Sequence, residues 1–236
     1  MGYTLNFDAV WRNFDNLLWG LGLSLVLAVV AIGIGCALGL VLAFGRISRM
    51  RMLSAPAGAY VTLFRNLPLL VIVLFSFFAL PQLGLRLSKQ SSFVLALALY
   101  SAAYLAEVFR GGLIGVPKGL REAGLAIGLT EGQIRRRIIL PVMIRAVLPA
   151  LGSTFTGLFK DTSLAAAIAV PELTFEARKI NVETFRVIET WIVASGLYIA
   201  TCSILAAILR RVEARLSVSR LSLIHISEPT RQEAIS

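Results

Sequence analysis

Long apolar stretches separated by short polar segments run through most of this chain. A transmembrane helix needs about 20 mostly apolar residues, because each residue adds about 1.5 Å along the helix axis. Five stretches are long enough, at about Leu17–Phe44, Pro56–Leu80, Ser92–Phe109, Ala146–Ala169 and Thr190–Leu209. The pattern therefore predicts an all-α integral membrane protein with about five transmembrane helices.

Polar residues interrupt two of these stretches. The second contains Arg65-Asn66-Leu67-Pro68, and the fourth is broken by Lys160-Asp161-Thr162-Ser163. A charged side chain inside a span is costly unless it faces protein or water. The interruptions are therefore the first places to look for function.

The region before the first span, residues 1–16, mixes apolar and charged side chains at a spacing that suits a short amphipathic helix at the membrane surface. The first span itself is rich in glycine, and Gly35 and Gly39 form a GxxxG step. Such a step permits close helix contact. The alternative is a glycine-rich helix that faces lipid.

Composition places the protein in a bilayer and removes nucleic acid as a partner. The chain is 57% hydrophobic and 15% charged, with a mean hydropathy of +0.81. A net charge of +10 would suggest nucleic acid in a soluble protein, but here the basic residues lie between apolar stretches. Membrane lipid is the expected surrounding.

The basic residues predict the orientation of the spans. They gather on one side of a five-span arrangement, in the loops after the first and third spans and in the segment after the fifth. That side is the cytoplasm, so the C-terminus is inside and the N-terminus outside. The outer loop Glu172–Glu189 carries more glutamates than basic residues.

Other features carry no predicted chemistry. Cys36 and Cys202 lie inside apolar runs without neighbouring ligands, so neither a disulfide nor a metal site is expected. Residues 221–236 look like a translated sequencing adapter, or else a disordered polar terminus, and are set aside as a non-native tail. Outside that tail, which contains His225, the chain has no histidine.

The polar segment 111–141 carries start and stop signals for two short helices. Pro117 is placed at the first position of a helix and Gly128 at its left-handed end. Thr130 and Gln133 then form a capping box that starts a second helix running into Pro141. A connection of this length predicts a docking element. The alternative is an amphipathic helix resting on lipid headgroups.

The same segment resembles the EAA loop of ABC importer permeases. Glu122-Ala123-Gly124, Gly128 and Ile138-Ile139-Leu140-Pro141 match that motif in residue and spacing, with Gly124 in place of its second alanine. The resemblance implies that this coupling loop inserts into a cleft of a separate cytoplasmic ATPase subunit. The implied docking residues are Glu122, Ala123, Gly124, Gly128, Leu129, Ile138, Leu140 and Pro141.

Three further blocks, Phe64–Val71, Ala103–Gly112 and Lys160–Leu164, resemble the polar amino-acid permeases of the histidine, glutamate/aspartate and glutamine type. The resemblance covers about residues 15–215. It implies one permease domain over 17–215, in a bacterial inner membrane, that translocates a polar L-amino acid. The implied partners are ATPase subunits that bind ATP and Mg²⁺, a second permease chain (itself or a relative) and an extracytoplasmic solute-binding protein.

A zwitterionic substrate needs polar partners within the spans. Ser153, Thr156 and Lys160 share one face of an unbroken helix, and we expect this face to line the translocation cavity. Lys160 and Asp161 have an alternative reading, as a structural pair that neutralises itself. The substrate-path candidates are Ser153, Thr156, Lys160, Asp161, Thr162, Ser163, Tyr104 and Glu107. Ser153 and Thr156 stand where the resembled family has asparagine and a β-branched apolar residue.

Rival functions find little support in the residues. A serine hydrolase relying on histidine lacks one, and an aspartyl dyad needs two membrane aspartates where only Asp161 lies in a span. No GxxxxGK[ST] phosphate loop occurs, so ATP hydrolysis must come from a partner, and no cofactor is expected in this chain. A stand-alone secondary transporter or channel is the remaining alternative, and the loop 111–141 argues against it.

Overall fold

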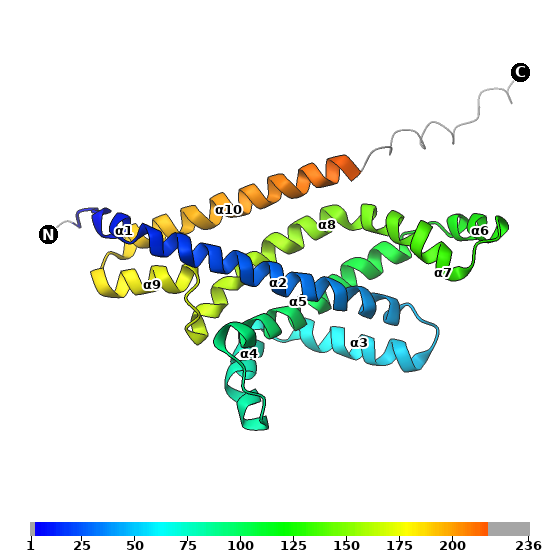
Figure 1. Cartoon of the computed structure of the whole chain (residues 1–236), viewed down its shortest axis with the longest axis horizontal. Helices are drawn as coiled ribbons and strands as arrows, with labels where there is room; N and C mark the ends of the chain where they lie inside the picture. Colours follow the sequence, from blue (N-terminus) through cyan, green and yellow to red (C-terminus); the bar gives the residue numbers. More distant parts are fainter. Residues whose placement is uncertain (1–2, 217–236) are drawn as a thin grey trace, which may run out of the picture.

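The computed structural model describes residues 3–216, which contain helices and no strand (Figure 1). The tail at 221–236 therefore lies outside the described residues. In chain order the helices are α1 (Asp8–Arg12), α2 (Phe14–Arg46), α3 (Arg51–Asn66), α4 (Leu69–Leu74), the π-helical turn η1 (Phe75–Ala79), the 3₁₀ turn η2 (Leu80–Leu83), α5 (Lys89–Ile114), α6 (Lys118–Ala126), α7 (Glu131–Ile134), the π-helical turn η3 (Arg135–Ile139), α8 (Leu140–Lys160), the 3₁₀ helix η4 (Asp161–Ile168), α9 (Leu173–Thr184) and α10 (Val187–Leu216).

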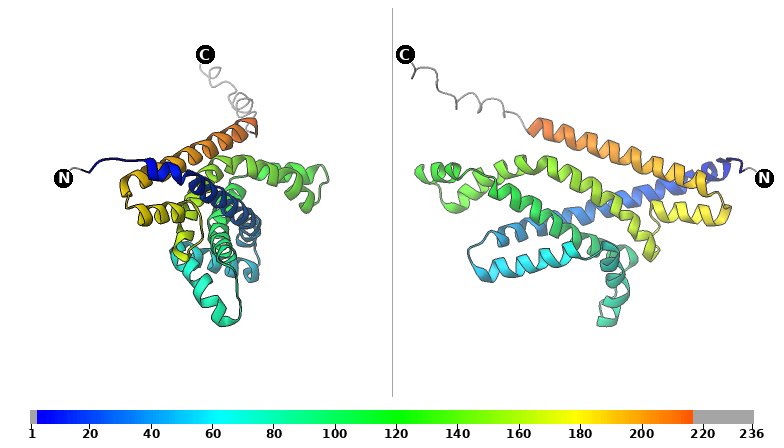
Figure 2. Two further views of the ribbon diagram at one scale, coloured as in Figure 1. Left: turned by 60° about the vertical axis from the view of Figure 1, so that its left-hand side comes forward. Right: turned by 180° about the vertical axis from the view of Figure 1, so that it is seen from behind.

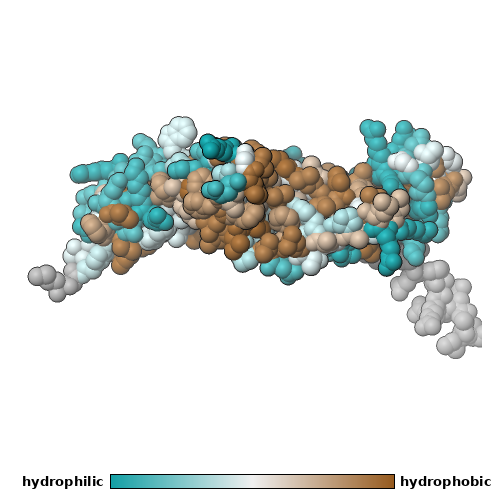
Figure 3. Space-filling view, turned by 90° about the horizontal axis from the view of Figure 1, so that it is seen from below, coloured by the Kyte–Doolittle hydropathy of each residue, from teal (hydrophilic) through white to brown (hydrophobic). Residues whose placement is uncertain are grey.

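Four helical runs are long and apolar enough to cross a membrane. They are Phe14–Arg46, Lys89–Ile114, Glu131–Ile168 and Val187–Leu216, and a bent pair, Arg51–Asn66 with Leu69–Leu83, makes a fifth if it counts as one span. Figure 3 shows apolar side chains in the middle of the molecule and polar side chains at both ends, as a bilayer requires. The predicted all-α membrane fold is therefore confirmed.

The second apolar stretch, Pro56–Leu80, is bent at the polar interruption that the sequence shows at residues 65–68. Helix α3 ends at Asn66, α4 begins at Leu69, and the chain turns by 103° between the two segments. Proline disfavours helical geometry in the residue before it, and Leu67 is extended, with ψ 137°. The bend directs α4 and the turns after it away from the line of α3, and Figure 2 shows this region projecting from the bundle.

The fourth stretch changes helix type where the sequence predicts a break. Helix α8 follows directly from α7 and η3, and at Asp161 the α-helix gives way to the 3₁₀ helix η4. Ala169, at a left-handed φ of 55°, ends this run. The polar residues at 160–163 therefore lie at a junction between two helical geometries.

Helix α5 is the centre of the fold and packs closely on α2. A Cβ atom added at Gly35 would lie 2.0 Å from the Ser101 Oγ atom, and one at Gly39 would lie 3.0 Å from the Ala102 carbonyl oxygen. Both glycines are buried, whereas Gly33 of the same helix is exposed and has no such neighbour within 4 Å. The GxxxG step therefore makes a helix contact, and the lipid-facing alternative is wrong.

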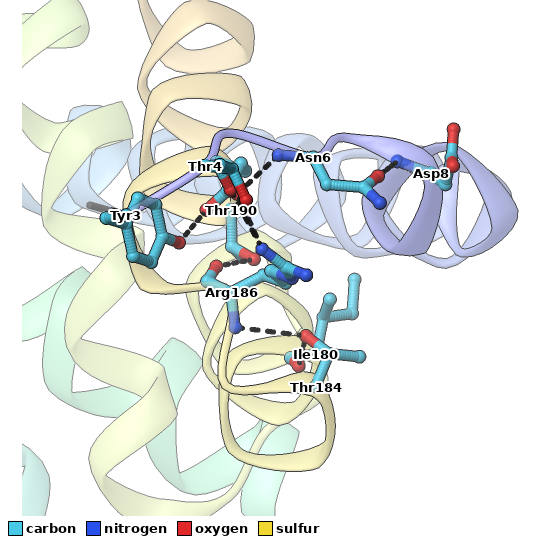
Figure 4. A network of polar contacts seen from close by, with 9 residues as sticks. Tyr3, Thr4, Asn6, Asp8, Ile180, Thr184, Arg186 and Thr190 are labelled. Atoms are coloured by element: carbon cyan, nitrogen blue, oxygen red, sulfur yellow. Dashed lines mark hydrogen bonds and ion pairs between the residues drawn. The ribbon is translucent and has the colours of Figure 1, made fainter. Parts of the chain in front are cut away.

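Different short helices lie at the two ends of the molecule. Figures 1 and 2 show α6 and α7 at one end, with α1 and α9 at the other. The N-terminal segment lies against the corner between α9 and α10 (Figure 4). There Tyr3 donates a hydrogen bond to Glu189, the Asn6 N–H donates to the same carboxylate at 2.8 Å, and Arg186 donates to the Thr4 carbonyl at 3.1 Å.

Candidate functional site

Helices α6 and α7 form a closed helical hairpin at the end that the charge pattern assigns to the cytoplasm. Gly128 has φ 79°, and the N–H of Leu129 donates to the Gly124 carbonyl at 3.0 Å, which closes α6 as expected. The predicted capping box is present, since Thr130 and Gln133 each receive the other's backbone N–H. Pro117 lies just before α6, at the N-cap position, rather than at its first residue.

A small residue at Gly124 lets the two helices of this hairpin meet. Gly124 is buried, and a Cβ added there would lie 2.9 Å from Cγ1 of Ile134 and 3.1 Å from Cδ1 of Ile138. Arg121 of α6 also forms an ion pair with Glu131 of α7. Gly124 therefore serves contacts inside the hairpin and does not face outward.

The predicted docking residues fall into three groups by exposure. Glu122, Ala123 and Gly128 are exposed, whereas Gly124 is buried and the remaining members, Leu129, Ile138, Leu140 and Pro141, are half-buried. Sequence reasoning missed two exposed apolar side chains near the corner, Leu125 at 43% and Ile127 at 75% exposure. Their signal is an apolar pair directly before a glycine helix end, where a solvated corner would be polar.

The polar face that the sequence predicts on the fourth span lines a groove between α8 and α10. Ser153, Thr156 and Lys160 line a cavity of about 400 Å³ together with Arg210 and Glu213 of α10. The hydroxyl groups of Ser153 and Thr156 donate back to the carbonyls of residues 150 and 152, at 3.0 and 2.9 Å. Their oxygen lone pairs are therefore left to accept hydrogen bonds from a group in the groove.

The turn at 160–163 does not present all of its side chains in one direction. Among the salt bridges of residues 3–216 none joins Lys160 to Asp161, so the two side chains are not in direct contact, and their reading as a self-neutralising pair stays an alternative. Lys160 is exposed, and Asp161 and Ser163 are half-buried. Thr162 is fully buried and donates to the Phe159 carbonyl at 2.7 Å, which indicates a structural contact.

Tyr104 and Glu107 lie on α5 and do not line the α8–α10 groove. Glu107 forms ion pairs with Arg46 of α2 and, at 2.8 Å, with Arg110. The Arg65 guanidinium lies 5.3 Å from the centre of the Tyr104 ring. Sequence reasoning used Arg46 only to assign the cytoplasmic side, and its long-range pairing gives no local signal.

The fold is that of the permease subunits of ABC importers. A solved structure described as an amino acid ABC transporter with histidines superposes with a TM-score of 0.83 at 30% identity, and the match covers 90% of this chain and all of that chain. A structure of the MetNI methionine ABC transporter shares the fold, with a TM-score of 0.70 at 19% identity, over 90% of this chain and all of that one.

Sequence comparison gives the particular family. The family described as binding-protein-dependent transport system inner membrane component matches residues 35–218, and the chain belongs to this family. The chain is 34% identical to the glutamine transport system permease protein GlnP of Escherichia coli (strain K12), over 90% of this chain and 98% of that protein. It is 39% identical to the octopine transport system permease protein OccM of Rhizobium meliloti, over 86% and 87% of the two chains.

Proposed function

We propose that this chain is the permease subunit of an ATP-driven importer that carries a polar L-amino acid across a bacterial inner membrane. The observation that carries the proposal is the exposed α6–α7 hairpin on a multi-pass fold shared with an amino acid ABC transporter. The hairpin docks into a cytoplasmic ATPase subunit, which binds ATP and Mg²⁺. The permease itself transports and is not catalytic.

Two further partners follow from this role. Alternating access needs two facing halves, and α10 supports a second permease chain because only 6% of its apolar window is buried within this chain. A solute-binding protein delivers the amino acid to the outer side, as the family description supports. Helices α8 and α10 then lie next to the partner chain.

The substrate path in this proposal runs along the polar face of α8. Ser153 and Thr156 accept hydrogen bonds from the substrate ammonium group, and Lys160 attracts its carboxylate. Asp161 and Ser163 extend the path at the start of η4. Tyr104 and Glu107 contribute from α5 only if the second chain completes the path beside them.

The function is tested by reconstituting this chain into proteoliposomes with its cognate ATPase and solute-binding protein. Uptake of radiolabelled glutamine, histidine, glutamate and cystine is measured with ATP and with a non-hydrolysable ATP analogue. We expect uptake of at least one of these amino acids only when ATP is hydrolysed. Uptake without the ATPase subunit contradicts the proposal and supports a secondary transporter.

Replacing Thr156 with phenylalanine is expected to lower the initial rate of uptake about tenfold, because misplacing substrate groups by about 1 Å costs that much or more. The ring fills the groove between α8 and α10, while the complex assembles normally. The matched control is Thr154→Phe, since Thr154 lies on the same helix and does not line the groove. Normal uptake by an assembled Thr156→Phe complex removes this groove from the path.

A further inference from the structure

Glu172 is a fully buried carboxylate on the outer side, in the segment that joins η4 to α9. It caps the first turn of α9 by accepting hydrogen bonds from the N–H groups of Thr174, at 3.0 Å, and Phe175, at 2.8 Å. The same carboxylate also accepts from Ser24 of α2, at 3.3 Å, and Tyr198 of α10, at 3.1 Å. One side chain therefore connects three helices.

Helix α2 approaches this carboxylate at the distance of backbone contact. A Cβ added at Gly20 would lie 2.9 Å from the backbone carbon of Glu172 and 2.9 Å from the nitrogen of Leu173. The N–H of Leu173 donates to the Ser24 hydroxyl at 3.4 Å. The start of α9 therefore sits in a fixed place on α2 that only glycine at position 20 permits.

The corner between η4 and α9 links the position of η4 to the fixed position of the start of α9. Ala169 adopts a left-handed conformation with φ 55°, and Lys89 of α5 donates to its carbonyl at 3.4 Å. The N–H of Val170 donates to the Ala165 carbonyl at 3.2 Å, and that of Glu172 to the Val170 carbonyl at 2.8 Å. A shift at Glu172 therefore shifts the end of η4 as well.

We propose that Glu172 is a positioning residue that holds the polar turn at 160–163 in its place relative to α2 and α10. The proposal rests on the proposed function, since it treats this turn as part of the substrate path. Glu172 does not touch the substrate. It acts through α9 and η4, because a short 3₁₀ helix has poor internal hydrogen-bond geometry and needs support at its ends.

The charge state of Glu172 adds a pH dependence to this support. Burial raises the pKa of Glu172 to about 7, although the N–H groups of Thr174 and Phe175 favour the charged form. The groups facing the carboxyl are Thr174 on α9, the Ser24 hydroxyl on α2 and the Tyr198 phenol on α10, and Lys89 of α5 binds the same corner at Ala169.

The sign of the effect follows from the raised pKa. The folded chain binds this proton more tightly than the unfolded chain, whose carboxyl has its ordinary pKa of 4.5. The stabilising contribution is therefore complete below pH 4.5 and is lost as the pH rises through 7. We expect the thermal midpoint of the wild type, relative to that of Glu172→Gln, to fall between pH 5 and pH 8. A pH-independent difference contradicts this expectation.

Two substitutions separate the local cap from the links between helices. Glu172→Asp keeps an oxygen for the first turn of α9 but shortens the side chain, so that it no longer reaches α2 and α10. Tyr198→Phe removes one donor and retains the ring, whose centroid lies 5.9 Å from that of Phe159. The control is Glu183→Gln, an exposed glutamate at the other end of α9.

The variants are compared in the full complex by hydrogen exchange and by uptake. Loss of a hydrogen bond to a buried carboxylate corresponds to about a fivefold change, so we expect exchange in 161–168 and the KM of uptake each to rise about fivefold. We expect the maximal rate and complex assembly to stay unchanged. Faster exchange confined to residues 173–176, with an unchanged KM, makes Glu172 a local helix cap and overturns the proposal.

The two readouts also separate this proposal from the proposed function. If the wild-type complex imports none of the tested amino acids, the proposed function fails, and exchange in 161–168 still decides whether Glu172 positions η4. If Glu172→Asp does not fold, Tyr198→Phe and Ser24→Ala test the same links from their partners. If hydrogen exchange in residues 161–168 stays at the wild-type rate in both of these variants, the positioning role is overturned.

Discussion

Replacing Glu122 with lysine is expected to uncouple this permease from its ATPase and to lower transport-coupled ATP hydrolysis about 100-fold, the size of a strong interface hot spot. Glu122 is exposed on α6, in the hairpin that we propose docks into the ATPase. Reversing its charge places a cation where the hairpin otherwise presents an anion to its partner. The measurement is copurification of the ATPase in detergent together with ATP hydrolysis in proteoliposomes.

The matched control reverses an exposed glutamate at the opposite end of the molecule. Glu183→Lys on α9 changes the net charge equally, and we expect it to leave copurification and ATP hydrolysis at the wild-type level. A fully coupled complex carrying Glu122→Lys shows that the hairpin is not the docking element. The secondary-transporter reading then becomes the better one.

The hairpin was predictable because its signals are local. A capping box needs two side chains three residues apart, and a left-handed helix end needs a glycine. Thr130 and Gln133 therefore predict the start of α7, and Gly128 predicts the end of α6, from neighbouring residues alone. The inward position of Gly124 was not predictable, since it depends on where Ile134 and Ile138 lie after the hairpin closes.

The bend after α3 shows where local signals end. Pro68 predicts that a helix ends before it, but it does not predict the direction in which the chain continues. That direction follows from burial of Leu69, Ile72 and Val73 in one cluster with Phe93 and Leu97 of α5. Pairing of segments this far apart depends on tertiary packing, which hydrophobic periodicity alone does not reveal.

The polar face of α8 illustrates the same division. Helical spacing places Ser153, Thr156 and Lys160 together, and the structure finds them lining one groove. Helical spacing does not pair Glu107 with Arg46, or Glu172 with Ser24, because each pair joins helices far apart in sequence. The sequence singles out Asp161 and Glu107 because they lie in predicted spans, and Glu172 lies outside those spans.

The contact between α2 and α5 predicts the largest loss of stability. Gly39→Val adds a branched side chain where a Cβ alone lies 3.0 Å from the Ala102 carbonyl oxygen and 3.0 Å from the Leu105 Cβ atom. A backbone oxygen in the middle of a helix has little room to move, so the two helices must separate. Overpacking of this kind costs about 3 kcal/mol, which lowers the thermal midpoint by about 10 °C.

The control for this prediction lies on the same helix. Gly33 is exposed and has no atom within 4 Å of a built Cβ, so Gly33→Val carries the same change in helix propensity without the clash. Thermal unfolding of both variants in detergent, followed by tryptophan fluorescence, separates the two effects. Equal midpoints for Gly39→Val and Gly33→Val show that α2 and α5 adjust without loss, and the close contact is then no source of stability. A lower midpoint for Gly39→Val alone assigns the loss of stability to packing at the GxxxG step. Because α5 also packs against α3 and α8, the positions of these helices depend on the same contact.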